Sequence, residues 1–145
     1  MIDVPRDDLV LMMEAGYIYL AGGKLNEAKQ VFEGVSVLKP KHEIPMVAIA
    51  NVLFAQKKFP QAIKLLKEAL KINPKSVFAL SHLGESLLFS NKKEEALKIL
   101  NQAVALDGQS SAGQFARSLI QLIEQGYDPE KFRKEMKAAQ KEAKE

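Results

Sequence analysis

Apolar residues recur at intervals of three and four along most of the chain, and Gly and Pro stand mainly between the segments that show this spacing. Such spacing places apolar side chains on one face of a helix, whereas a half-buried strand would alternate at every second residue. No stretch has a convincing strand pattern. The pattern therefore predicts an all-α protein.

One segment is repeated three times at a fixed interval. Each copy has alanine at its third position and an apolar residue four places later. The copies begin 34 residues apart, with NEAKQVF at 26–32, PQAIKLL at 60–66 and EEALKIL at 94–100. Pro40, Pro74 and Gly108 follow the same interval, and each closes a helical segment. The interval divides the chain into three units, each made of a helix A, a turn, a helix B and a loop.

Small and large residues alternate at fixed places in these units. Two helices packed about 8 to 10 Å apart need a side chain of one methyl group or none where they cross, with bulky neighbours around it. The expected small positions are Gly16, Ala50 and Gly84 in the A helices and Ala28, Ala62 and Ala96 in the B helices. The expected large positions are Tyr19, Leu53 and Leu87, then Phe32, Leu66 and Leu100. Of the three positions that follow in helix B, Ala69 and Ala103 are small and Val35 is heavier.

In these residues and in its 34-residue period the sequence resembles the tetratricopeptide repeat family over about three quarters of its length. The Trp usual in helix A of that family is replaced by Met12, Met46 and Leu80. The resemblance implies a right-handed α-solenoid of three helix pairs, which we place at 9–42, 43–76 and 77–110. We expect one domain over residues 1–145.

Two further helices are predicted after the third unit. Residues 110–126 have a serine start, an apolar stripe and Gly126 as a stop, which is typical of a helix that caps a stack. Residues 128–145 begin with a good N-cap pair, Asp128 and Pro129, and form a charged helix. We expect this last helix to be a solvated terminal helix, and an anchor for an acidic partner is the alternative.

Composition and charge exclude several classes of function. The 145 residues include 21 basic and 18 acidic side chains that are well mixed, and the net charge is +3. Nucleic-acid binding is not expected, since it would need a concentrated basic stripe. We expect no membrane span and no cleaved signal, and therefore a cytoplasmic protein. Without Cys there is no disulfide and no thiolate site.

No residue pattern indicates catalysis, a metal site or a cofactor site. His42 and His82 are far apart in the sequence, without carboxylates at ligand spacing. GGKL at 22–25 is not a phosphate loop, and GQSSAG at 108–113 is not a nucleophile elbow. We therefore expect no enzyme activity, no metal and no cofactor.

The resemblance implies that the A helices line a concave groove where a protein partner binds. The lining positions that it implies are Val10, Met13, Tyr17, Leu20, Ile44, Val47, Asn51, Phe54, Phe78, Ser81, Glu85 and Leu88. Independently, residues 9–23 are apolar nearly all round their helix, and such a helix must be covered by something. The alternative is that Met13, Tyr17 and Phe54 are only core between neighbouring units.

One branch of the family grips acidic chaperone tails with Lys, Arg and Asn on these helices. The corresponding places in this chain are Met13, Tyr17, Ala48, Phe78 and His82, with Asn51 as the one amide nearby. The cationic grip is therefore missing, and we expect an amphipathic helix or an extended apolar segment as the ligand.

The segment GYIYLAGGKLNEAKQVFEGV at 16–35, with the LKP that follows, is similar to the first repeat of the tetratricopeptide chaperones of bacterial type III secretion. Those chaperones are usually acidic and have a longer N-terminal arm, so we do not expect dimerisation through such an arm. The hypothesis is a secretion chaperone that forms a hetero-oligomer with an aggregation-prone subunit. The alternative is a structural adaptor or assembly scaffold.

Overall fold

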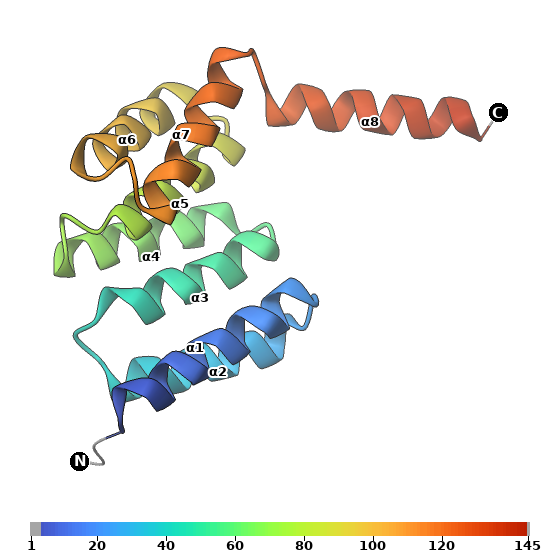
Figure 1. Ribbon diagram of the computed structural model, residues 1–145. Helices are drawn as coiled ribbons and strands as arrows, with labels where there is room; N and C mark the ends of the chain where they lie inside the picture. The colour runs from blue at the N-terminus through green and yellow to red at the C-terminus, as the bar shows by residue number, and fades with distance from the viewer. Residues whose placement is uncertain (1–3, 145) are drawn as a thin grey trace.

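The computed structural model describes residues 4–144, which form eight α-helices and no strand. The helices are α1 (Arg6–Ala21), α2 (Leu25–Leu38), α3 (Glu43–Ala55), α4 (Phe59–Ile72), α5 (Val77–Phe89), α6 (Lys93–Leu106), α7 (Ser111–Glu124) and α8 (Pro129–Ala143). Figure 1 shows them stacked as successive hairpins, with α8 projecting from the end of the stack. The predicted all-α solenoid of three helix pairs followed by two further helices is confirmed.

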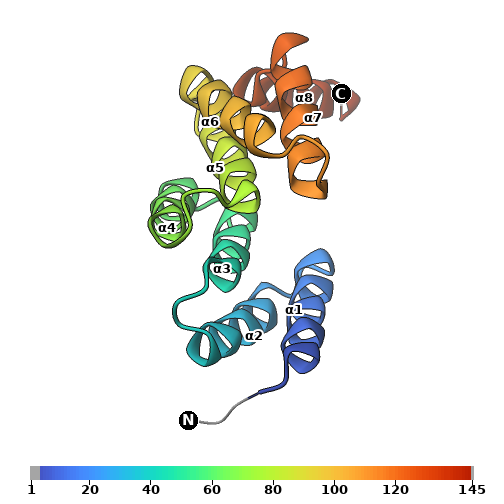
Figure 2. The same cartoon turned by 60° about the vertical axis from the view of Figure 1, so that its left-hand side comes forward.

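The helices pack as A and B layers. The pairs α1 with α2, α3 with α4 and α5 with α6 form the hairpins, and each A helix also contacts the next A helix. Figure 2 shows the same stack from another side, with α1 and α2 at one end and α7 and α8 at the other. Helices α3, α5 and α7 start 34 residues apart, as do α2, α4 and α6. The period read from the sequence is therefore the spacing of the helix starts.

The small residues lie where the helices cross. A methyl group added at Gly16 would overlap the ring of Phe32, and one added at Gly84 would overlap the side chain of Leu100. Ala62 and Ala96, on the B side of the crossings, are completely buried. Close helix packing of this kind leaves no room for a larger side chain.

The A helices all end in the same way. The second residue after each helix takes the left-handed conformation, with φ of 76° at Gly23, 63° at Lys57, 62° at Asn91 and 84° at Gly126. The next amide then donates to a carbonyl five residues back, for example from Lys58 to Leu53 at 2.9 Å. This bond closes a helix end and satisfies a carbonyl that would otherwise lack a partner.

The buried side chains form two clusters. The larger one runs through α3 to α7 and includes Leu66, Leu83 and Leu100. The smaller one joins the first hairpin to α3 and consists of Ala28, Phe32, Ala48 and Val52, with partly buried neighbours. The first unit is thus attached to the rest of the stack through few buried side chains.

Helix α8 makes few contacts with the stack. Its N-cap Asp128 accepts hydrogen bonds from the backbone amides of Glu130 and Lys131, as its sequence predicted. Pro129 is buried, and every later described residue of the helix is exposed. Two contacts tie its first turn to the stack, a hydrogen bond from Asn91 to Glu130 and the packing of Tyr127 on Phe132.

Candidate functional site

The A helices lie side by side and form one continuous surface. The Asn51 amide of α3 donates to the Tyr17 hydroxyl of α1 at 3.3 Å, and the Ser81 hydroxyl of α5 lies 2.8 Å from the Ala112 carbonyl of α7. Helices α3 and α5 also pack on each other. We define the A-helix face as the predicted lining residues that are at least partly exposed, together with His82, which packs beside Phe78, and Phe115, which packs beside His82. Its members are Val10, Met13, Tyr17, Leu20, Ile44, Asn51, Phe54, Phe78, His82, Glu85 and Phe115.

Nine of the twelve residues predicted to line a groove belong to this face. The other three, Val47, Ser81 and Leu88, are buried. Val47 and Leu88 belong to the larger core cluster, and Ser81 is hydrogen-bonded between α5 and α7. We therefore leave these three out of the binding surface, and the role of the other nine stays a prediction.

Tyr17 is the centre of the amino-terminal half of the A-helix face. Its ring packs 5.0 Å from that of Phe32, and its hydroxyl accepts the hydrogen bond from Asn51. Burial raises the pKa of Tyr17, and the Asn51 hydrogen bond partly opposes this shift. The hydroxyl is therefore neutral at physiological pH, and as an acceptor in this bond it keeps its own hydrogen for a second partner.

The carboxy-terminal half combines aromatic rings with one polar pair. The His82 ring lies between those of Phe78, at 4.9 Å, and Phe115, at 5.3 Å. Its Nδ1 is 3.3 Å from Glu85 Oε1. This half offers flat apolar area with one place for hydrogen bonding, a combination typical of surfaces that recognise peptides.

A row of aromatic side chains follows the turn ends of the hairpins. Phe54 packs on Phe59 and on Phe89, each at 5.2 Å. The row continues from Phe89 to Tyr127 at 6.5 Å and from Tyr127 to Phe132 at 5.9 Å. It joins the A-helix face to the first turn of α8.

Sequence reasoning missed some of these residues. Phe115 lies 34 residues after Ser81, so extending the period into α7 would have identified it. Phe59 and Phe89 lie at helix ends but also follow an apolar residue by 34 positions, so the period reaches them too, whereas Tyr127 lies between α7 and α8.

The A-helix face is poor in positive charge. Helices α3 and α5 contain no Lys or Arg. Arg6 lies in the first turn of α1, and Arg117 of α7 donates to the Gly108 carbonyl at 3.0 Å. The face therefore has apolar area and hydrogen-bonding groups but no cation placed to hold a carboxylate.

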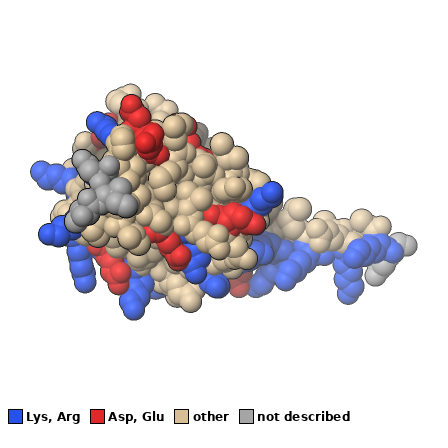
Figure 3. All heavy atoms as spheres, turned by 90° about the horizontal axis from the view of Figure 1, so that it is seen from below, with Lys and Arg blue, Asp and Glu red and all other residues tan. Residues whose placement is uncertain are grey.

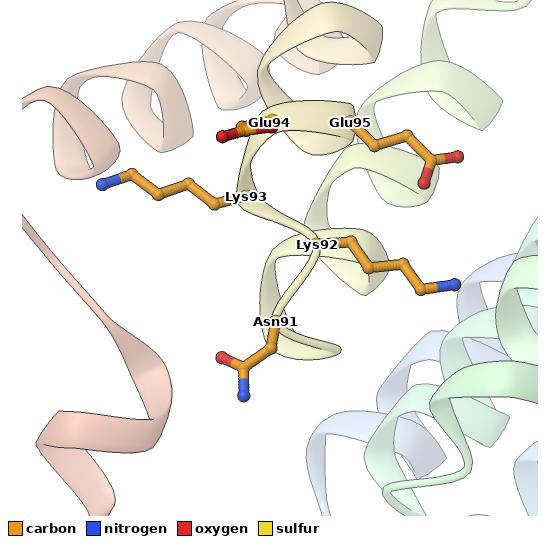
Figure 4. Close-up of a pocket in the computed structure, with 5 residues that line it drawn as sticks. All are labelled: Asn91, Lys92, Lys93, Glu94 and Glu95. Carbon is orange, nitrogen blue, oxygen red and sulfur yellow. The ribbon is translucent and has the colours of Figure 1, made fainter.

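No other feature of residues 4–144 suggests a chemical site. A hollow at the α5–α6 turn is lined by residues 91–95, whose charged side chains point in different directions (Figure 4). Among the residues described, no group of three His, Asp or Glu could hold a metal ion. None of the described helices is both long and apolar enough to span a bilayer.

Comparison with family models identifies the repeats. Models described as tetratricopeptide repeat match residues 13–77 and residues 53–120. Together the two matches run from 13 to 120, which is most of the chain. Comparison with curated proteins found no significant match.

Solved structures with the same fold include type III secretion chaperones and a domain bound to an HSP90 peptide. SycD, a type III secretion translocator chaperone of Yersinia enterocolitica, is 19% identical with a TM-score of 0.70, over 86% of this chain and 98% of SycD. PcrH of Pseudomonas aeruginosa, solved with the chaperone binding region of PopB, is 15% identical with a TM-score of 0.67, over 83% and 97%. The first tetratricopeptide domain of Spaghetti (RPAP3), bound to the HSP90 peptide SRMEEVD, is 24% identical with a TM-score of 0.68, over 87% and 98%.

Proposed function

This chain belongs to the tetratricopeptide repeat family of non-enzymatic protein-binding modules, and on that premise we propose that it is a cytoplasmic chaperone of a bacterial type III secretion system. In this proposal the A-helix face holds an amphipathic or apolar segment of a secreted subunit. The segment stays soluble because its apolar side chains are covered until export.

The observation that carries the proposal is the chemistry of the A-helix face. Met13, Tyr17, Phe54 and Phe78 present apolar and aromatic area, and α3 and α5 contain neither Lys nor Arg. Burial of apolar area contributes about 25 cal/mol per Å², so such a face favours apolar side chains. An acidic tail would lose its water there without meeting a cation.

Solved structures of the same fold hold segments of partner proteins. SycD has been solved with a peptide of the translocator YopD, and PcrH with the chaperone binding region of PopB. The same fold also binds the acidic peptide SRMEEVD in Spaghetti (RPAP3). The missing cations on the A-helix face favour the translocator-type ligand for this chain.

Co-expression tests the proposal. We expect the chain to keep a small, otherwise insoluble protein encoded by a neighbouring gene in solution as a 1:1 complex. Tyr17→Asp with Phe54→Asp places two charges on the A-helix face and should reduce binding by at least about 100-fold, measured by calorimetry on the purified proteins.

A matched control separates loss of binding from loss of fold. Val37→Asp changes an apolar residue of α2 that is 78% exposed and lies outside the A-helix face, so binding should be unchanged. Circular dichroism of each variant checks that the helices are retained. An adaptor that binds through another surface would keep its partner in the folded double variant, and that result would contradict the proposal.

A further inference from the structure

Two helices at opposite ends of the stack carry apolar residues that the described residues leave uncovered. They are the first helix, α1, and the last, α8. Figures 1 and 2 both place α1 at one end of the molecule and α8 at the other, so α8 does not reach its own α1. Neither uncovered face belongs to the A-helix face.

The uncovered face of α1 lies opposite to its packed side. Leu9 and Gly16 are buried against the stack, whereas Leu11 is 62% exposed and Ile18 is 72% exposed. Leu11, Ala15 and Ile18 follow the i, i+4, i+7 spacing of one helical stripe. An end unit of a solenoid normally has a polar outer face, so an exposed apolar stripe at this place is unusual.

The uncovered face of α8 has the spacing of the B helices. Phe132, Met136 and Ala139 lie at i, i+4 and i+7, as Ala28, Phe32 and Val35 do in the first unit. Phe132 is 48% exposed and Met136 is 47% exposed. Helix α8 thus has the apolar stripe of a helix that packs on another helix, but no helix lies on it.

Helix α7 does not offer α8 a matching surface. Its exposed side is mostly polar, with Leu122 the one large apolar residue on it. The polar members of that side are Gln114, Arg117, Ser118, Gln121 and Glu124. In addition, α8 has the bulky Phe132 where the B helices have the alanine of the crossing. If α8 folded back on α7, it would bury the polar side chains of α7 and place the ring of Phe132 where the crossing has room for alanine only.

The two helices that carry the uncovered faces have opposite net charge. The charged residues of α1 are Asp7, Asp8, Glu14 and Arg6, a net charge of −2. Helix α8 has five basic and three acidic residues, a net charge of +2. Figure 3 views the molecule from the α1 and α2 end and shows Lys and Arg gathered along the α8 arm. Their lengths also match, since 16 and 15 residues correspond to about 24 and 22 Å.

We propose that α8 of one molecule packs on the outer face of α1 of a second copy of this chain. Phe132 and Met136 then cover Leu11 and Ile18, and the small Ala139 lets the helices approach closely. The basic flank of α8, with Arg133 and Lys137, lies against the acids of α1. The contact joins unlike ends of two molecules. None of its residues belongs to the A-helix face, so it is independent of the protein ligand proposed there.

Sedimentation of the whole chain over a range of concentrations tests for this contact. One helix pair buries less than the ~1,200 Å² of a standard interface, so we expect a Kd on the order of 10 to 100 µM. Leu11→Asp with Ile18→Asp, and separately Phe132→Asp with Met136→Asp, should each weaken self-association at least about 10-fold. A wild-type chain that stays monomeric up to about 500 µM would overturn the proposal.

Mixing the two double variants is the decisive step. The α1 variant retains an intact α8, and the α8 variant retains an intact α1, so together they can make one contact. We expect a 1:1 heterodimer from the mixture with the wild-type Kd, although each variant alone associates at least about 10-fold more weakly. If either variant alone associates like the wild type, or the mixture forms no heterodimer, the contact is not between α1 and α8.

Two controls separate this proposal from its alternatives. Tyr17→Asp with Phe54→Asp should leave self-association unchanged while removing ligand binding, so the two proposals can fail independently. Co-sedimentation with vesicles of phosphatidylcholine and phosphatidylglycerol tests a membrane as the partner of α8. A monomeric chain that binds these vesicles through Phe132 would show that the second-copy proposal is wrong.

Discussion

Lys57 takes a left-handed backbone conformation that residues with a Cβ atom disfavour. Gly23, Asn91 and Gly126 take the same conformation at the ends of the other A helices. Gly and Asn are the residue types that tolerate this conformation best, and Lys is not one of them. The repeat geometry fixes the turn in the second unit, because the following amide still donates to Leu53.

Replacing Lys57 by Gly should stabilise the protein. The substitution removes the steric cost of the left-handed conformation, and we expect a gain of about 0.5 to 1 kcal/mol in the free energy of unfolding. Urea denaturation measures it. Lys57→Ala is the matched control, because it removes the charge and keeps the Cβ atom. Equal stability of the two variants would show that the turn is not strained.

The arrangement within each hairpin was the part of the fold that the sequence predicted best. Helix starts, crossing positions and turn positions all follow the interval of 34, because each hairpin must fit against its neighbour in the same way. The stripe of lining residues was less predictable. A side chain at the same repeat position is partly exposed in one unit and fully buried in another, as Met13 and Val47 are, because the end unit has a neighbour on one side only.

The crossing alanines should tolerate no larger residue. Ala62→Leu or Ala96→Leu inserts a bulky side chain where two helices touch, and we expect a loss of about 1 to 3 kcal/mol. Thermal denaturation followed by circular dichroism measures it. Ala105 of the same helix as Ala96 is exposed, so Ala105→Leu is the control and should change stability by less than about 0.5 kcal/mol. Unchanged melting of the crossing variants would contradict the packing described for these positions.

For the whole molecule, the sequence predicted α8 as a solvated terminal helix, and every described residue after Pro129 is exposed, but the pattern within α8 did not exclude packing on a neighbour. Its stripe of Phe132, Met136 and Ala139 fits a helix packed on a neighbour as well as a solvated end helix. The outcome depends on what α7 presents, and the polar outer side of α7 leaves α8 apart from the stack. A pattern within one helix cannot report the surface of another.

Removing residues 128–145 should therefore leave the stack nearly as stable as before. Beyond Pro129 the helix buries no side chain, and we expect the free energy of unfolding to change by about 1 kcal/mol or less. Removing α7 as well would expose Leu119 and Ile123 together with the core that they cover, and should cost several times more. Chemical denaturation of both truncated chains measures the difference. A large loss on removing α8 alone would mean that it supports the stack.

The division of the core into two clusters gives the molecule an uneven resistance to opening. The first hairpin is held by Ala28, Phe32, Ala48 and Val52, whereas the later hairpins share one large cluster. We therefore expect the first hairpin to open before the remaining helices lose their packing, since local openings follow the weakest junction. Tyr17 would move with it and break its bond to Asn51. Such an opening would separate α1 from α3, so a segment already folded as a helix would enter the A-helix face from the side.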